Sequence, residues 1–332
     1  MGQKKLKIIA IIAAYNEGDV IYHVVRHLVE NGMEVYFIDN NSTDNTVEEV
    51  SKWLGKGLMH IERFPQDCGY DEECKDVYVW SALLQRKEEL QKKLNADWYL
   101  HYDADEFRES PWVDLSLREG IELVDKLGFN CIDFECLNFK PVDNSFQPGT
   151  DIRDYLLYYN LMEGSYKQIK CWKYFGQEVD LVSSGGHEAI FSGRKIFPIK
   201  FIMLHYPIRS QEHGLKKVYG ERLSRYSRKE REKGWHIHYK QYEQDTTANF
   251  LFNPVELIKH DPVETRRLAI IRGIERDIAE LKKQKDEEIK QKDAMIRWFQ
   301  NSKSWRITSP LRWLDNFVKK IIMWGILRCH IV

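Results

Sequence analysis

The stretch IIAIIAA, residues 8–14, runs directly into Tyr15-Asn16-Glu17, and this passage decides the fold. An unbroken apolar run of this length is typical of a strand covered on both faces, as in a parallel sheet. Residues 20–29 then carry apolar side chains at helical spacing, and we expect Asp19 to cap that helix. A buried strand that leads into a helix is the first half of a βαβ unit.

The same alternation continues through the first 140 residues. Further strands are expected at 35–38, 58–61, 98–102 and 130–136. Further helices are expected at 44–54, at about 73–94, and at 115–127. Strands and helices in this order predict an α/β fold with a Rossmann-like, mostly parallel sheet flanked by helices. For residues 141–205 we expect an α+β extension of the same sheet.

The C-terminal third has a different pattern. Residues 263–300 contain no proline and one glycine, and the apolar positions Ile271, Ile274, Ile278 and Leu281 alternate by three and four. This spacing predicts a long helix with a coiled-coil seam, and through it a homodimer. We therefore divide the chain into a domain at 1–245, a linker at 246–262, the helix at 263–300 and a tail at 301–332.

The tail combines basic residues with tryptophans and ends in the apolar run 321–327. A basic amphipathic element of this kind favours contact with a membrane surface. The alternative is a C-terminal helix packed on the protein's own core. No stretch reaches the ~18 apolar residues of a spanning helix.

Composition excludes several classes of protein. The 332 residues carry 50 Lys+Arg against 51 Asp+Glu, and a net charge of −1 argues against a nucleic-acid partner. The 10 Trp, 17 Tyr and 15 Phe exclude disorder for most of the chain. Six cysteines without a Cys-x-x-Cys pair indicate a reduced, cytoplasmic protein. The phosphate loops of P-loop kinases and dinucleotide dehydrogenases are absent.

Polar clusters follow three of the expected strands. They are Tyr15-Asn16-Glu17, the run Asp-Asn-Asn-Ser-Thr-Asp at 39–44, and Asp-Ala-Asp-Glu at 103–106. Because ligands bind at the carboxyl ends of parallel strands, we expect these clusters to converge on one edge of the sheet.

The third cluster is the sharpest signal. Three carboxylates within four residues repel one another unless a cation neutralises them. Oxygen ligands of this kind suit Mg²⁺ or Mn²⁺, and such an ion would also bind a diphosphate. A solvated acidic turn is the alternative, but the position directly after the aromatic strand 98–102 favours the metal site.

Together these motifs resemble the family 2 glycosyltransferases of the GT-A type, in the subgroup with Asp-x-Asp-Glu-Phe. Residues 15–17 resemble the family's first-strand motif. Residues 38–44 resemble its second motif, with Asn40-Asn41 in place of the usual Asp-Gly. Asp103-Ala104-Asp105 resembles its metal-binding Asp-x-Asp. The resemblance covers residues 5 to 240.

The resemblance implies a nucleotide-sugar donor and a divalent ion. The residues expected to bind the donor are Tyr15, Asn16, Glu17, Asp39, Asn41, Asp44, Asp103 and Arg209. Asp105 would ligate the ion beside Asp103, with His205 as the third candidate ligand. Family 2 enzymes invert the anomeric centre, and Glu188 is the candidate base. Structural roles remain open for His205 and Glu188, and a solvated helix face for the basic cluster at 209–225.

The expected function is a metal-dependent, inverting transfer of one sugar to a glycan or lipid-linked acceptor. The Gln-x-x-Arg-Trp motif of processive synthases is absent, because Ala294 stands where its Gln would be. Residues 304–312 resemble a tail segment of bacterial surface-polysaccharide transferases, which favours synthesis at the inner face of the plasma membrane. The alternatives are a sugar nucleotidyltransferase and a non-catalytic, membrane-associated scaffold.

Overall fold

The computed structural model describes residues 5–65, 79–161, 167–222, 225 and 248–301. By contacts within the chain, residues 1–274 form one compact unit and residues 275–332 a second. The expected tail at 301–332 lies outside the described residues, apart from its first residue.

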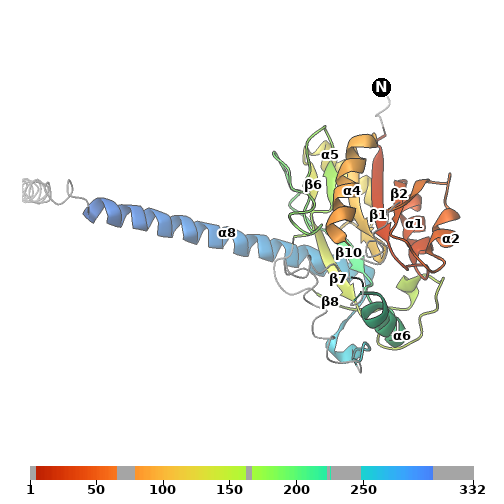
Figure 1. The fold of residues 1–332 in the computed structure, drawn as a ribbon. Helices are drawn as coiled ribbons and strands as arrows, with labels where there is room; N and C mark the ends of the chain where they lie inside the picture. Colours follow the sequence, from red (N-terminus) through yellow and green to blue (C-terminus); the bar gives the residue numbers. More distant parts are fainter. Residues whose placement is uncertain (1–4, 66–78, 162–166, 223–224, 226–247, 302–332) are drawn as a thin grey trace, which may run out of the picture. The chain divides into compact units, whose positions relative to one another are not determined.

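The centre of the first unit is a six-stranded sheet in the order β3-β2-β1-β4-β9-β6 (Figure 1). Its strands are β1 (Ile8–Ala14), β2 (Glu34–Asp39), β3 (Leu58–Arg63), β4 (Trp98–Asp103), β6 (Cys131–Ile132) and β9 (Cys171–Lys173). The first four are mutually parallel, and β9 is antiparallel to β4 and β6. The expected mostly parallel α/β sheet is confirmed.

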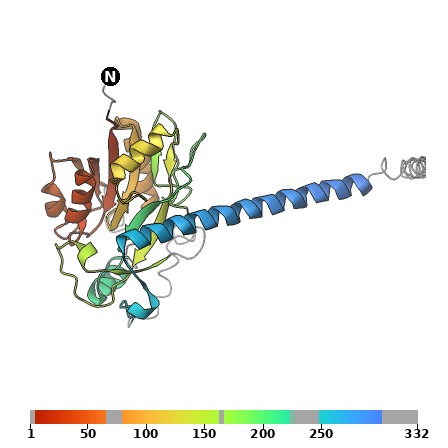
Figure 2. The same ribbon diagram turned by 180° about the vertical axis from the view of Figure 1, so that it is seen from behind.

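Helices cover both faces of this sheet, which is why β1 is apolar throughout. α1 (Ile21–Glu30), α2 (Thr46–Ser51) and α5 (Leu117–Lys126) pack on one face, together with Ile8, Ala10 and Ile12. α4 (Trp80–Lys93) packs on the other face, with Ile9 and Ile11 (Figures 1 and 2). Side chains alternate along a strand, so each face of β1 lies in a different core.

A second sheet corrects the expectation of one extended sheet. It has five strands in the order β11-β8-β7-β10-β5. They are β5 (Glu106–Glu109), β7 (Phe134–Phe139), β8 (Tyr158–Leu161), β10 (Phe201–His205) and β11 (Ile258–Lys259). Along the described strands the chain passes between the two sheets five times, for example at the turn between β4 and β5 and at Asp133 between β6 and β7. The Asp133 carboxylate accepts a hydrogen bond from the backbone N–H of Gln168 and pairs with Lys200, which stabilises the crossing from β6 to β7.

The structure corrects the expected cap of α1 and the extent of one expected helix, and it describes only part of another. Asp19 does not cap α1: the capping position is Val20, without a side-chain hydrogen bond, because the Asp19 carboxylate binds Arg209. The helix expected at 44–54 is the shorter α2. The helix expected at 73–94 is described only as α4, since residues 66–78 lie outside the described residues.

The rest of the described chain consists of loops, short helical turns and one long helix. Short helical turns are η1 (Ile152–Asp154), α6 (Gln211–Leu215), the π-helix η2 (Lys216–Arg222) and η4 (Pro254–Glu256). Part of the expected linker at 246–262 is ordered, because it holds η4 and β11. The expected long helix is confirmed as α8 (Pro262–Asn301). Its seam residues Ile271, Ile274, Ile278 and Leu281 are 44–64% exposed. Over the residues that the structure describes, no helix has the length and apolar content needed to cross a membrane.

Candidate active site

The three polar clusters meet at the carboxyl edge of the first sheet. β1 lies between β2 and β4, and the register pairs Ala14 with Asp39 and Ala13 with Asp103. The loops that leave these strands therefore start side by side. The expected convergence of the clusters follows from this strand order.

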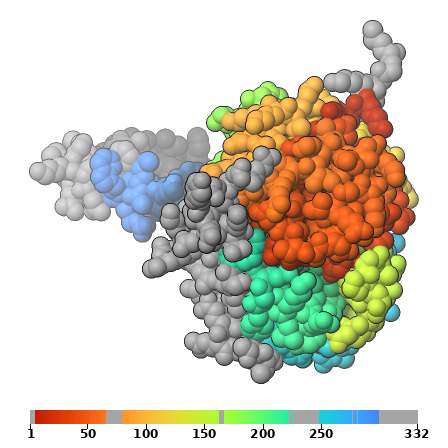
Figure 3. All heavy atoms as spheres, turned by 45° about the vertical axis from the view of Figure 1, so that its right-hand side comes forward, coloured from red at the N-terminus to blue at the C-terminus, as the bar shows by residue number. Residues whose placement is uncertain are grey.

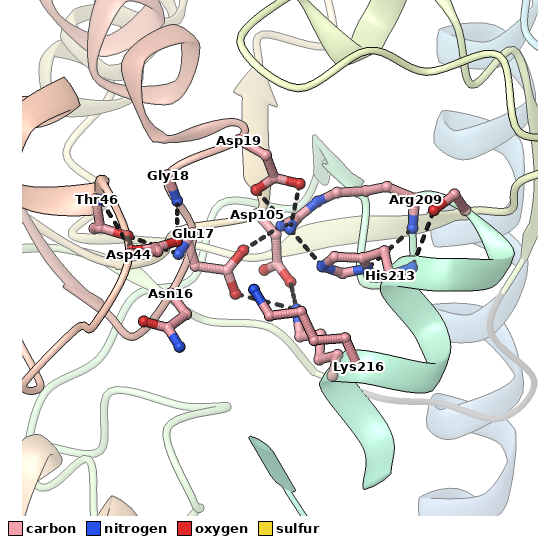
Figure 4. Close-up of polar contacts among 12 residues, drawn as sticks. Asn16, Glu17, Gly18, Asp19, Asp44, Thr46, Asp105, Arg209, His213 and Lys216 are labelled. Carbon is pink, nitrogen blue, oxygen red and sulfur yellow. Dashed lines mark hydrogen bonds and ion pairs between the residues drawn. The ribbon is translucent and has the colours of Figure 1, made fainter. Parts of the chain in front are cut away.

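Two of the expected donor-binding residues hold the first two loops together (Figure 4). Asp44 accepts hydrogen bonds from the backbone N–H groups of Gly18, at 3.1 Å, and Thr46, at 2.9 Å. Asn16 accepts from the backbone N–H of Thr43 at 2.8 Å and donates to Glu221 at 2.9 Å. Asn16 has a φ of 53°, in the left-handed region that asparagine tolerates well.

Three further expected residues line the β1–β2 side of this edge. The guanidinium of Arg225 lies 3.4 Å from the centre of the Tyr15 ring, a cation–π contact. The Asp39 carboxylate is 4% exposed and accepts from the backbone N–H of Ser42. Asn41 accepts a hydrogen bond from Arg63 at 2.5 Å. Aromatic, carboxylate and amide groups are thus gathered where a nucleotide base and ribose are expected.

Glu17 is the centre of a buried ion-pair network (Figure 4). It accepts hydrogen bonds from Arg209 and, at 3.1 Å, from the ammonium of Lys217. Arg209 also binds both carboxylate oxygens of Asp19, at 3.0 and 3.2 Å. Burial alone would raise the pKa of Glu17, but the charges of Arg209 and Lys217 hold it well below its usual range. We name Glu17, Asp19, Arg209 and Lys217 the Glu17 network.

Arg209 follows β10, where the chain enters α6. Its side chain has no exposed surface, and its guanidinium bonds only to side chains of the protein. Ser210 caps α6 by accepting from the backbone N–H of His213, which fixes the start of that helix. In this structure Arg209 therefore braces α6 against the β1 loop, whereas the sequence suggested direct contact with the donor.

Asp105 and His205 form the candidate ligand pair for a divalent cation. β5 and β10 are antiparallel, with His205 opposite Glu106, so the two side chains start from neighbouring strands. His205 Nε2 lies 3.7 Å from Asp105 Oδ1, and Lys217 Nζ lies 3.1 Å from Asp105 Oδ2. A carboxylate oxygen and an imidazole nitrogen this close fit Mn²⁺ or Mg²⁺, which commonly take their other ligands from water and a diphosphate.

Asp103 forms an ion pair with the ammonium of Lys170. Lys170 donates at 2.8 Å to both Asp103 and Glu106, and Arg108 also binds Glu106, at 2.5 Å. Burial opposes the charge of Asp103, but Lys170 holds its pKa well below the usual range. In the described part of the chain, no three acidic, histidine or cysteine side chains gather as ion ligands. Of the expected ligands, Asp105 and His205 thus lie together, while Asp103 pairs with Lys170, and the set of three stays a prediction.

Glu188, the expected base, faces Arg194. The two side chains form an ion pair at 3.0 Å, and each is 25% exposed. The preceding residue, His187, has its Nδ1 3.2 Å from Nε2 of the buried Gln168. Glu188 is therefore held by a counter-ion, while His187 is held by a neutral amide.

A groove of about 930 Å³ opens beside the Glu17 network. Figure 3 shows the surface where its walls meet: the first loops in red and orange, α6 in green and the loop near 145–149 in yellow-green. Asn16, Asp19, Asp44 and Lys216 are among the residues that line it. Its walls combine apolar surface with amide and carboxylate groups, and these polar groups can hydrogen-bond a polyhydroxylated ligand.

Residues 9–70 match the family model "Glycosyl transferase family 2", a segment that runs from β1 past the end of β3. This part of the chain is therefore similar to the family 2 glycosyltransferases, in agreement with the resemblance of its motifs. A comparison with curated protein sequences finds no match.

Solved structures show a distant likeness. A mannosyltransferase from Pyrobaculum calidifontis, in complex with GDP-Man and Mn²⁺, is 16% identical at a TM-score of 0.29 over 40% of this chain and 36% of that one. TarS 1–349 from S. aureus, in complex with UDP-GlcNAc, is 13% identical at a TM-score of 0.33, over 63% and 61%. This chain thus spans less than two thirds of the length of either.

Sequence analysis missed Lys170, Gln168 and His187. Lys170 neutralises Asp103 from 67 positions away, so no local pattern connects the two. Gln168 and Lys170 are two positions apart, a spacing that places side chains on one face of an extended segment, and this was the available signal. The glycines at 185 and 186 indicated a turn before His187, without indicating which of its residues faces the edge.

Proposed function

We propose that this protein is a metal-dependent, inverting glycosyltransferase, and that it moves one sugar from a nucleotide-sugar donor to a glycan or lipid-linked acceptor in bacterial surface-polysaccharide synthesis. The observation that carries the proposal is the Asp105–His205 pair at the carboxyl edge of the sheet. Its place beside the Tyr15–Asp39 side of the same edge supports a donor that lies across β1 and β4.

Each part of the edge has a task in this reaction. Tyr15, Asp39 and Asn41 orient the base and ribose, and Asp105 and His205 hold Mn²⁺ or Mg²⁺. The bound cation would offset the charge that develops on the departing diphosphate. The ammonium of Lys217 lies 3.1 Å from Asp105 and adds a second positive charge at the same place. The acceptor hydroxyl attacks the anomeric carbon from the opposite side, which inverts its configuration.

Release of nucleoside diphosphate from a panel of sugar nucleotides tests this proposal. We expect turnover with Mn²⁺ or Mg²⁺, its loss after chelation with EDTA, and a drop on the order of 100-fold in Asp105→Asn. Asp114→Asn, a change at an exposed carboxylate outside the edge, is the matched control and should keep the wild-type rate. Equal turnover by wild type and Asp105→Asn, with and without chelator, contradicts the metal-dependent mechanism.

A further inference from the structure

The turn that carries His187 packs directly on β4. Gly185 and Gly186 have φ values of 65° and 88°, in the region that favours glycine. A Cβ atom on Gly186 would lie 3.0 Å from Nε2 of His101. That same Nε2 lies 3.8 Å from Oδ1 of Asp103. His187 therefore directly follows a glycine that packs against His101, and the imidazole of His101 adjoins the candidate site.

The surroundings of His187 differ from those of Glu188. Glu188 lies opposite Ile169 in a parallel bridge, and its carboxylate is bound by Arg194. His187 is exposed, and in the described part of the chain its ring is bonded through Nδ1 to Gln168 alone. The imidazole is thus anchored on one side and open on the other, as a group that contacts a substrate must be.

Gln168 is suited to hold this ring. It is 4% exposed, and its backbone N–H donates to Asp133 at 2.7 Å. Its side-chain oxygen is buried and has no hydrogen-bond partner among the residues that the structure describes. A half-turn of the amide brings this oxygen to Nδ1, where it accepts the N–H of the ring. Nε2 then keeps its lone pair, which is the form of histidine that accepts a proton.

We propose that His187, oriented by Gln168, is the base of the sugar transfer and replaces Glu188 in that role. The inference rests on the proposed function. As the acceptor oxygen bonds to the anomeric carbon, its proton passes to Nε2 of His187. The bond from that carbon to the diphosphate breaks, and its electron pair leaves with the nucleoside diphosphate. Gln168 is a positioning residue, because it acts through the ring.

The charges around His187 agree with this role. The surrounding protein removes part of the His187 ring from water and so lowers its pKa, although the residue keeps exposed surface, and the charge of Lys170 lowers the pKa further. Asp103, Glu106 and Glu188 act in the opposite direction but do not outweigh these effects. The ring is therefore neutral at pH 7 and able to take a proton.

The test uses the full chain, the donor that wild type turns over best, and water as the acceptor. Rates are measured with His187→Ala, and with His60→Ala as the matched control at an exposed histidine of β3. We expect kcat to fall on the order of 100-fold in His187→Ala, with an unchanged Kd for the nucleoside diphosphate. Free imidazole should restore part of this kcat, and His60→Ala should match wild type.

Gln168 variants and a pH profile separate a base from a merely structural residue. Gln168→Glu can only accept from Nδ1 and should retain more kcat than Gln168→Leu. The kcat of wild type should fall as acid protonates His187, and this dependence should vanish in His187→Ala. Circular dichroism confirms that each variant is folded.

Two outcomes overturn the proposal in different ways. Undiminished kcat in His187→Ala, or a defect in Glu188→Gln in its place, overturns the role of His187 and leaves the proposed function standing. Absence of turnover by wild type with every donor overturns the proposed function, and the role of His187 with it.

Discussion

Two polar clusters lie at the same edge of the first sheet, and they differ in how their charged side chains are paired and exposed. In the Glu17 network, each carboxylate has a cationic partner, and Arg209 has no exposed surface. Around Asp103, the side chain of Asp103 is 28% exposed, and Gln168 and His101 each have a buried polar atom with no hydrogen bond to the described residues, as does Nε of Arg209 in the Glu17 network.

The comparison of the two clusters helps to distinguish residues that stabilise the fold from residues that could contact a ligand. Buried polar atoms normally find partners, and unpaired ones tend to mark sites where something else binds. Glu17 lies in the first-strand motif, and in this structure its ion pairs attach α6 to the β1 loop. The two clusters differ in exposure, because Arg209 is fully buried whereas the side chain of Asp103 keeps exposed surface at the end of β4.

The largest expected effect comes from breaking the Glu17 network. Arg209→Met leaves two buried carboxylates without their shared cation, so we expect the free energy of unfolding to fall by about 3–5 kcal/mol. Urea denaturation measures this loss. Arg26→Met, which breaks an exposed pair with Glu30, should leave the midpoint near that of wild type. Similar losses in the two variants would show that the Glu17 network contributes no more to stability than an exposed ion pair.

The next largest expected effect tests the cluster around Asp103 by a substitution of Lys87. Its ammonium is buried and bonds to His101 Nδ1 at 2.8 Å, and burial lowers its pKa to about 7. The unfolded chain keeps a lysine pKa near 10.5, so between these values the unfolded state binds more protons and stability rises with pH. The cost of burying the charge is present in full below pH 7.

We therefore compare wild type with Lys87→Met by urea denaturation at about pH 7 and about pH 9.5. From the lower pH to the higher one, wild type should gain on the order of 3 kcal/mol relative to the variant. The variant cancels the titration of cysteines and tyrosines, which both proteins share. A constant difference between the two proteins would show that Lys87 is charged in the folded state at both pH values.

The smallest expected effect on stability concerns the turn beside His101. Gly186→Ala introduces a side chain at positive φ, which costs about 1–2 kcal/mol. Its Cβ would also press on His101 and Leu84. Gly193→Ala has a similar φ of 79° but meets no atom within 4 Å. Gly186→Ala should lose at least as much stability as Gly193→Ala, and only Gly186→Ala should lose donor turnover. Equal loss of turnover would argue that strain alone is responsible.

The sequence predicted the first sheet and the meeting of its three clusters because both follow from local patterns. The apolar run at 8–14 indicates a strand buried on both faces, and parallel strands place their carboxyl ends together. The second sheet was not predictable in this way. The chain leaves the first sheet at Asp133, whose partners Gln168 and Lys200 are distant in sequence.

The ion pairs of the site show the same limit. Asp105 was identified from its motif, but its contact with Lys217 spans 112 positions. Glu188 was chosen as the carboxylate next to a glycine-rich turn, and that pattern did not single out His187. Whether adjacent side chains face the same way depends on the backbone of a short turn, and two glycines there leave that direction undetermined by sequence.

The pairing of β5 with β10 has a consequence for how activity arises during folding. Asp105 and His205 meet only because His205 stands opposite Glu106 in this ladder. A slip by one residue would turn the imidazole to the far side of the sheet. A chain that has completed only its first sheet would present Tyr15 and Asp39 but no ligand pair. Metal-dependent turnover would then report that both sheets have assembled in the correct alignment.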